Sequence, residues 1–327
     1  MKNVSAIVYH EHGDPAEVTR VEQQDIGAPG LGEVLVEMQA APINPVDLNV
    51  IEGKYPVRPP LPAVGGVEGV GVVAAVGAAV NLRVGAHVLL PWHAGSWREA
   101  CVVPVSQLTP IPADIPFEQA AMLRINPPTA WRMLHDFVPL KPGNWLIQNA
   151  ANSGVGRAVI QIAKALGIRT VNLVRRAELI EELRAEGGDV VLVEGDGLPK
   201  QIADATGDAK ILLGLNCVGG ESALRVSNVL AHGGTLVTYG AMARQPLRMP
   251  ASLLVFKDLT FRGFWVTQWM QRADAQEKHA MFDCLFPLAR SGVLRTKIDT
   301  TYPIHAAREA IVHAQQGERS GKILFKF

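Results

Sequence analysis

The segment 149–156 has the composition and the position of a turn that could bind a phosphate group. It reads Asn-Ala-Ala-Asn-Ser-Gly-Val-Gly, between the apolar run 145–147 and a stretch, 157–166, whose apolar residues recur with helical spacing. Strand, small-residue turn and helix in this order form the first half of a dinucleotide-binding βαβ unit. Small residues let backbone N–H groups approach a pyrophosphate at the positive end of the helix dipole. Ala151 and Ser153 replace two glycines of the usual pattern, but the context favours a nucleotide site over an ordinary tight turn.

Two arginines stand where such a unit selects its cofactor. The segment 170–174 predicts the second strand, and Arg175 and Arg176 follow it directly. NAD-binding units usually carry an acid about 20 residues after the glycines, where it binds the ribose 2′-hydroxyl. Arg175 occupies that place, and a guanidinium suits a 2′-phosphate through charge-assisted hydrogen bonds. We therefore predict NADP(H) rather than NAD(H); the alternative is that both arginines merely end a strand at the surface.

Length and charge exclude several classes of protein. The 327 residues suffice for two domains with a substantial core. The 31 basic residues equal the 31 acidic ones, so no basic field suggests nucleic acid or a membrane surface as a partner. Cys101, Cys217 and Cys284 are far apart and fit neither a disulfide framework nor a CxxC metal pair, which favours a reducing compartment.

No targeting or membrane segment is expected. The chain reaches an apparent strand at residues 6–9, which leaves no room for a signal or transit peptide. No run of about 18 or more apolar residues suggests a transmembrane helix. We expect a soluble cytoplasmic protein.

The elements that must position these residues change in kind near residue 116. Residues 1–116 read as an irregular β-domain with a proline-rich loop at 53–62 and strands at 33–38, 70–76, 87–90 and 100–103. Strands alternate with helices in 117–266, which predicts a doubly wound parallel sheet of the α/β class. Its further strands are expected at 190–193, 211–215 and 235–239, with an edge strand at 260–264.

The remaining residues, 267–327, are expected to return to the first domain. A helix is predicted over 275–290, and two short strands, 298–302 and 323–327, flank a helix near 306–314. The predicted domains are therefore 1–116 with 267–327, and 117–266.

This order resembles the medium-chain dehydrogenase/reductase superfamily, which joins a GroES-like β-domain to a Rossmann nucleotide-binding domain. Zinc-dependent members carry an early cysteine and a Gly-His-Glu motif. Here residues 43–47 read Ile-Asn-Pro-Val-Asp, and Val67 stands in Gly-Val-Glu-Gly where the histidine ligand would be. The four-cysteine zinc lobe is also missing, so we predict no metal.

Within the superfamily the chain resembles the mitochondrial-type trans-2-enoyl thioester reductases. Four segments carry the resemblance: 43–66, 125–134, 148–161 and 262–269. The Asn-Ser-Gly-Val-Gly turn and the Gly-Phe-Trp-x-x-Gln-Trp segment are fairly specific to that group. Quinone reductases of the superfamily more often have Ala-Ala-Gly-Gly-Val-Gly in the turn.

The resemblance implies a role for each matching residue. Tyr55 falls on the catalytic tyrosine, Asn126 on a cofactor contact, and Lys322 would close the site. The 2′-phosphate would lie at Arg175 and Arg176, although Ala177 replaces a third polar residue. The pyrophosphate would be held by Asn152, Ser153, Gly154, Val155 and Gly156, and the nicotinamide side flanked by Tyr239, Gly240, Ala241, Met242, Phe264, Trp265 and Val266.

The predicted activity is NADPH-dependent reduction of the C2=C3 bond of acyl-CoA or acyl-carrier-protein 2-enoyl thioesters. Hydride goes to the β-carbon, and Tyr55, as a protonated phenol, donates a proton to the α-carbon. The alternatives are an NADPH:quinone or enone reductase on the same fold, and a non-catalytic NADPH-binding protein. Tyr55 could instead only pack against the prolines of its loop, and Asp47 and Glu68 receive no role. A homodimer is expected through the 260–264 edge.

Overall fold

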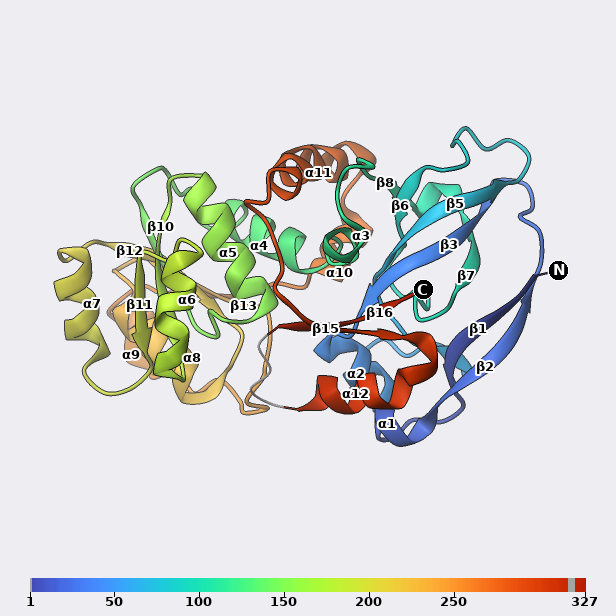
Figure 1. Cartoon of the computed structure of the whole chain (residues 1–327). Coiled ribbons are helices and arrows are strands. Elements are labelled where there is room, and N and C mark those ends of the chain that lie inside the picture. Colours follow the sequence, from blue (N-terminus) through green and yellow to red (C-terminus); the bar gives the residue numbers. More distant parts are fainter. Residues whose placement is uncertain (1, 317–320) are drawn as a thin grey trace. The chain divides into compact units, whose positions relative to one another are not determined.

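The chain folds into two compact units (Figure 1). The structure, a computed structural model, describes residues 2–316 and 321–327. The first unit comprises Met1–Ile125 and Arg295–Phe327, and the second comprises Asn126–Leu294. These limits differ from the predicted domain limits because helix α3 (Phe117–Ala120) packs against strands of the first unit, and helix α11 (Ala275–Arg290) packs against a helix of the second.

The second unit is built on a parallel six-stranded sheet in the order β11-β10-β9-β12-β13-β14. The strand order reverses between β9 and β12, which makes the sheet doubly wound and confirms the predicted fold class. Ligands of such sheets bind beyond the carboxyl ends of the strands at this switch point. The strands are β9 (Trp145–Gln148), β10 (Arg169–Val174), β11 (Val190–Val193), β12 (Ile211–Asn216), β13 (Thr235–Thr238) and β14 (Thr260–Gly263).

Helices cover both faces of this sheet, as the apolar strands require. Successive residues of β10 point to opposite faces. Leu173 packs in a cluster with helices α7 (Leu198–Thr206) and α8 (Gly220–Val229), and Val174 packs with α5 (Gly154–Ala165) and α6 (Ile180–Ala185). The unit also contains α4 (Asn126–His135), which packs against α5 and α11, and α9 (Ala251–Val255), α10 (Val266–Arg272) and the short helix η2 (Ala177–Leu179).

The first unit holds two sheets. The smaller has the order β2-β1-β4, with β1 (Lys2–Tyr9), β2 (Thr19–Ile26) and β4 (Ala63–Val64). The larger has the order β15-β16-β3-β5-β6-β8, and β7 also pairs with β3. The C-terminal strand β16 thus lies antiparallel to β3. The larger sheet's strands are β3 (Glu33–Pro42), β5 (Val70–Val76), β6 (His87–Leu89), β7 (Ala100–Pro104), β8 (Thr109–Pro110), β15 (Ile298–Pro303) and β16 (Lys322–Lys326).

Short helices connect these strands, and the sequence analysis did not predict most of them. Helix α2 (Pro45–Ile51) begins with a proline, whose missing N–H is no loss in the first turn. The Asp47 carboxylate accepts the backbone N–H of Asn44 at 2.7 Å and caps its start. The others are α1 (Pro15–Val18), α12 (Ala307–Gln315), η1 (Val105–Gln107) and η3 (Ile304–Ala306). No helix among the described residues is long and apolar enough to cross a membrane.

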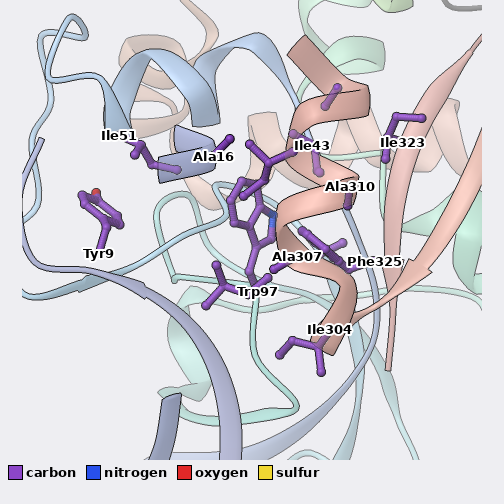
Figure 2. Packing of buried hydrophobic residues seen from close by; sticks show 14 of the residues in the cluster. Tyr9, Ala16, Ile43, Ile51, Trp97, Ile304, Ala307, Ala310, Ile323 and Phe325 are labelled. Carbon is purple, nitrogen blue, oxygen red and sulfur yellow. The ribbon is translucent and has the colours of Figure 1, made fainter. Parts of the chain in front are cut away.

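Trp97 is the central side chain of the first unit's core (Figure 2). Its indole is fully buried, meets the ring of Phe325 edge-on at 5.3 Å, and donates a hydrogen bond to the carbonyl of Pro42. A Cβ atom at Gly65 would lie 2.3 Å from this indole, so only glycine lets the backbone pass there. The packing therefore fixes the path of the chain just before Val67 and Glu68.

Candidate active site

The turn after β9 has the geometry of a pyrophosphate-binding turn. Ser153 is the N-cap of α5, and its Oγ accepts the backbone N–H of Gly156 at 3.1 Å. A Cβ atom at Gly156 would lie 2.6 Å from the carbonyl oxygens of both Ala150 and Ala151. Only glycine fits there, although the two other glycines of the usual pattern are replaced. The close approach of strand end and helix start survives these replacements.

Arg157 holds one carbonyl of this turn. Its Nε donates to the carbonyl of Asn152 at 3.2 Å, and its guanidinium pairs with Glu182 and Glu186 of the α6 segment. The N–H groups of Gly154 and Val155 belong to the first turn of α5, where no carbonyl of the helix can accept them. Such a helix start fits an anionic group.

Two asparagines that the sequence analysis missed join the turns on either side of the switch point. Asn149 donates through Nδ2 to Asn216 Oδ1 and to Ser222 Oγ, each at 2.8 Å. Its Oδ1 accepts the N–H of Cys217 at 2.8 Å, and Asn216 Oδ1 also accepts the N–H of Gly219 at 3.0 Å. The turn after β9 is thereby fixed to the turn after β12. A polar residue at the carboxyl end of a buried strand was the available signal for both.

Arg175 and Arg176 lie directly after β10, the neighbour of β9 in the sheet. Arg175 is exposed, and the half-buried Arg176 pairs through Nε with Glu178 at 3.3 Å. Because parallel strands end at the same edge, both guanidinium groups belong to the edge that carries the turn. Their placement fits a 2′-phosphate.

The segment after β13 packs on the turn after β12. The N–H of Met242 donates to the carbonyl of Cys217 at 2.9 Å, and a Cβ atom at Gly240 would lie 2.7 Å from Cys217 Sγ. The Tyr239 hydroxyl is buried beside the side chains of Ser153 and Cys217, with neither in good hydrogen-bond geometry. Burial raises the pKa of Tyr239 well above its usual value, so the hydroxyl stays protonated. Ala241 and Met242 themselves are exposed.

The remaining predicted cofactor residues of this unit lie after β14 and at the start of α4. Phe264 packs its ring edge-on against Phe137 at 5.8 Å, and Trp265 is the partly exposed N-cap of α10 ahead of the buried Val266. Asn126, the first residue of α4, is buried, and its Nδ2 has no hydrogen-bond partner among the described residues. A buried donor without a protein partner is expected where a ligand accepts the hydrogen bond.

Tyr55 and Lys322 belong to the first unit, whereas the other predicted site residues belong to the second. Tyr55 is half-buried in the loop after α2, with its ring centroid 6.4 Å from that of His93. Lys322, the first residue of β16, donates through Nζ to Asn44 Oδ1. Within its own unit Lys322 is therefore part of a buried polar network.

The centre of that network is a pair of fully buried acids, Asp47 and Glu68, to which the sequence analysis gave no role. Asp47 accepts the N–H groups of Asn44 and Val67, each at 2.7 Å. Glu68 accepts Asn44 Nδ2 at 2.8 Å and the N–H of Arg124 at 3.2 Å. Each of these four bonds comes from a neutral donor, and the Lys322 charge lies nearby.

Burial decides the protonation of these acids. It raises the pKa of Asp47 to about 7 against the hydrogen bonds and the Lys322 charge, which lower it. Burial also raises the pKa of Glu68, with a further contribution from Asp47. In the part of the chain that the structure describes, no group of three or more histidine, cysteine, aspartate or glutamate side chains could hold a metal ion.

Comparison with known proteins identifies the family. Residues 30–113 match the alcohol dehydrogenase GroES-like domain, and residues 154–283 match the zinc-binding dehydrogenase family. The mitochondrial enoyl-(acyl-carrier-protein) reductase of Rattus norvegicus is 43% identical over 316 residues, which cover 94% of this chain and 85% of that protein. The chain belongs to the medium-chain dehydrogenase/reductase superfamily, in the family of these enoyl reductases.

Solved structures of the superfamily have the same fold over the whole chain. The complex of Etr1p with NADP and crotonyl-CoA has a TM-score of 0.91 at 27% identity, with 100% of both chains covered. A putative NADPH:quinone reductase from Bacillus thuringiensis has a TM-score of 0.92 at 28% identity, again with 100% of both chains covered. Both enoyl thioester and quinone reductases thus share the architecture of this enoyl reductase family member.

Gly156→Ala tests the pyrophosphate turn. We expect weaker NADPH binding, by roughly tenfold or more, because the added Cβ must push the helix start away from two carbonyl oxygens. Titration calorimetry with NADPH measures the affinity. Gly195→Ala is the matched control, because a Cβ atom there meets nothing within 4 Å. Equal affinities for the two variants would contradict the assignment of the turn.

Glu68→Gln tests the buried acids through the pH dependence of stability. A carboxyl whose pKa is higher in the folded than in the unfolded protein binds more protons when folded, so it lowers the free energy of unfolding as pH rises between the two values. For Glu68 that range runs from about 4 towards neutral pH. His93, whose pKa burial lowers to about 4, acts in the opposite direction below its ordinary value.

We therefore expect the free energy of unfolding of wild type, relative to that of Glu68→Gln, to decrease as the pH rises from about 4.5 to about 7.5. Urea denaturation at constant ionic strength measures this difference. Glu11→Gln, which changes an exposed acid of the same unit, serves as the control. A difference that stays constant or grows with pH would show that Glu68 is not held in its protonated form.

Proposed function

We propose that this chain reduces the C2=C3 double bond of 2-enoyl thioesters, carried by coenzyme A or acyl carrier protein, with NADPH. The observation that carries the proposal is 43% identity to an enoyl-(acyl-carrier-protein) reductase along 94% of the chain. The likeness to the Etr1p complex with NADP and crotonyl-CoA supports it. The turn at Gly156, the open donor of Asn126 and the arginines after β10 fit the cofactor.

The chain's own residues would bind, orient and protonate. NADPH, when bound, supplies the hydride that reaches the β-carbon. As negative charge develops on the thioester, the Tyr55 phenol gives its proton to the α-carbon. The hydrogen bonds of Asp47 fix the start of α2, and α2 ends at Ile51, shortly before Tyr55. The buried acids thus contribute to catalysis by positioning the loop that carries the proton donor.

Arg175 and Arg176 would set the preference for NADPH over NADH. Both follow β10 directly, and a guanidinium can form paired hydrogen bonds with a phosphate. The ion pair between Arg176 and Glu178 leaves Arg175, the more exposed of the two, as the main candidate for the 2′-phosphate.

Quinone reduction is the second candidate, because a putative NADPH:quinone reductase shares the fold at 28% identity, against 27% for the Etr1p complex. Fold alone does not choose between the two reactions. Tyr55 distinguishes them, since a quinone takes hydride without needing a proton delivered to carbon.

We also propose a homodimer formed through the edge of the second unit's sheet. The strand β14 ends the sheet, and an open edge tends to pair with another strand. Just before β14, Leu254, Val255 and Phe256 expose 49%, 70% and 78% of their surfaces. Apolar side chains beside an open edge favour contact with a second copy. Etr1p is known in a heterodimer with Etr2p.

A cytoplasmic location remains our proposal, whereas the relatives are described as mitochondrial. The structural observation that relates to location is that Cys101, Cys217 and Cys284 form no disulfide bond. Free thiols fit a reducing compartment.

Tyr55→Phe tests the proposed reaction. Wild type should reduce crotonyl-CoA rapidly with NADPH and slowly with NADH, and should reduce a simple quinone slowly with NADPH. The variant should lose roughly 100-fold or more in kcat with crotonyl-CoA, the usual contribution of a positioned acid, and little with the quinone. Absorbance at the nicotinamide band follows both reactions. Turnover of the quinone alone by wild type would select the second candidate.

Phe256→Glu tests the dimer. We expect the variant to be monomeric at micromolar concentration where wild type is dimeric, because burying an unpaired carboxylate in an apolar contact is costly. Light scattering after size-exclusion chromatography measures the mass. Val84→Glu, which changes an exposed residue of the first unit, should leave the dimer intact. A dimer that survives Phe256→Glu would argue for a different interface.

A further inference from the structure

A cavity of about 220 Å³ lies in the first unit, next to the loop that carries Tyr55. Pro59 and Pro60 of that loop line it on one side, and Val50 and Ile51 of α2 line it on another. Four polar side chains also reach it: Tyr9, Asp47, His93 and Arg98. Neither the sequence analysis nor the proposed reaction uses this cavity.

His93 connects the cavity to Tyr55. It lines the cavity, its ring lies 6.4 Å from that of Tyr55, and the ring of Trp92 meets it edge-on at 4.9 Å. Its backbone has φ of +61°, a left-handed conformation that residues other than glycine rarely adopt. The N–H of His93 donates to the carbonyl of Val67 at 3.2 Å, which helps to hold this conformation. Strain of this kind persists where the surrounding structure imposes it, and it concentrates at functional sites.

Polar atoms at the cavity require water. His93 Nε2 and Arg98 Nε are buried and have no hydrogen-bond partner within residues 2–316 and 321–327. A buried polar group left unpaired costs about 1–3 kcal/mol. A cavity of about 220 Å³ with several polar walls has room for several water molecules, which would supply these bonds.

The groups around the cavity can carry a proton at neutral pH. Burial lowers the pKa of His93 to about 4, so its ring is neutral, with one nitrogen that donates and one that accepts. Asp47, on the α2 side, has its pKa raised to about 7 by burial. Burial and Asp47 raise the pKa of Tyr9 to about 12, so its hydroxyl stays protonated. Behind Asp47, Glu68 and Lys322 complete the set of charged groups.

We propose that this cavity holds the water that returns a proton to Tyr55 after each turnover, with His93 as the link between the phenol and that water. The proposal rests on the proposed function. In each turnover the phenol O–H bond breaks as the Cα–H bond forms, which leaves a phenolate. In one concerted relay, one ring nitrogen of His93 gives its proton to the phenolate while the other takes a proton from a cavity water, and a proton from bulk solvent neutralises the hydroxide that remains. One hydride and one proton are consumed for each double bond reduced.

The need for such a supply follows from the reaction. Water must be kept from the hydride-transfer side of a reductase site, which leaves the phenolate to be protonated from elsewhere. Pro59 and Pro60 of the Tyr55 loop line the cavity, and His93 lines it too, with its ring centroid 6.4 Å from that of Tyr55. His93 acts through Tyr55, as the supplier of its proton, and does not itself touch the substrate.

His93→Asn tests the proposal in a stopped-flow experiment with NADPH and crotonyl-CoA. Asparagine tolerates the left-handed backbone but cannot pass a proton as an imidazole does. The first turnover uses the proton already on Tyr55, so it should keep its rate. We expect a burst of about one NADPH per subunit, followed by a steady state slower by roughly tenfold or more. The solvent deuterium isotope effect on the steady state should increase, and added imidazole should restore part of the rate.

Matched variants separate proton supply from packing. His87→Asn replaces another half-buried histidine of the same unit, whose ring packs on Phe117 at 4.6 Å, and should behave as wild type. His93→Phe removes both polar nitrogens and should give the same burst. Thermal melting and NADPH affinity check that each variant is folded.

Each other result overturns the proposal. If His93→Asn has the steady-state rate and the solvent isotope effect of wild type, Tyr55 does not receive its proton through His93. A first turnover slowed as much as the steady state would mean that His93 only orients Tyr55. If instead Tyr55→Phe leaves the first turnover with crotonyl-CoA unchanged, the proposed role of Tyr55 itself fails.

Discussion

The first unit depends on the hydrogen bonds that two buried carboxylates accept. A buried acid is tolerated only if protein donors surround it or it takes up a proton, and both conditions apply to Asp47 and Glu68. The donors come from the start of α2, from Val67 and from Arg124, and Lys322 of β16 adds its charge. Segments distant along the chain are held in one arrangement because any displacement would leave a buried acid unpaired.

In the second unit, neutral amide side chains hold distant segments together. Asn149 and Asn216 join the turns that follow β9 and β12, at the place where the strand order reverses. A carboxylate at this edge would repel a pyrophosphate, whereas amides fix both turns without adding charge. The start of α5 and the arginines after β10 then provide the positive potential. The amide network therefore suits a site for an anion, whereas the carboxyl network of the first unit lies next to the Lys322 cation.

The residues that fit the cofactor and the residues of the proposed proton transfer lie in different units. The residues that fit the cofactor belong to the second unit, whereas Tyr55, His93 and the buried acids belong to the first. Enoyl thioester and quinone reductases share this architecture. The fold therefore does not choose the acceptor, and in the proposed reaction that choice falls to first-unit side chains near Tyr55.

The sequence by itself determined the parts that depend on local pattern. Apolar runs such as 190–193, the turn at 149–156 and the arginines after β10 were predictable, because periodicity and spacing along the chain carry that information. Short elements such as α2 were missed, since a proline start and a capping acid look like a loop in a proline-rich segment.

Only the tertiary structure decided which distant residues meet. Glu68 and Lys322 belong to one polar network although they are far apart in the sequence, and Asn149 meets Asn216 of the neighbouring strand β12. The left-handed His93 beside Tyr55 likewise left no pattern in the sequence. Burial shifts the pKa of a side chain and can leave a polar atom without a hydrogen-bond partner. Burial arises from contacts between distant segments, which the spacing of residues along the chain does not encode.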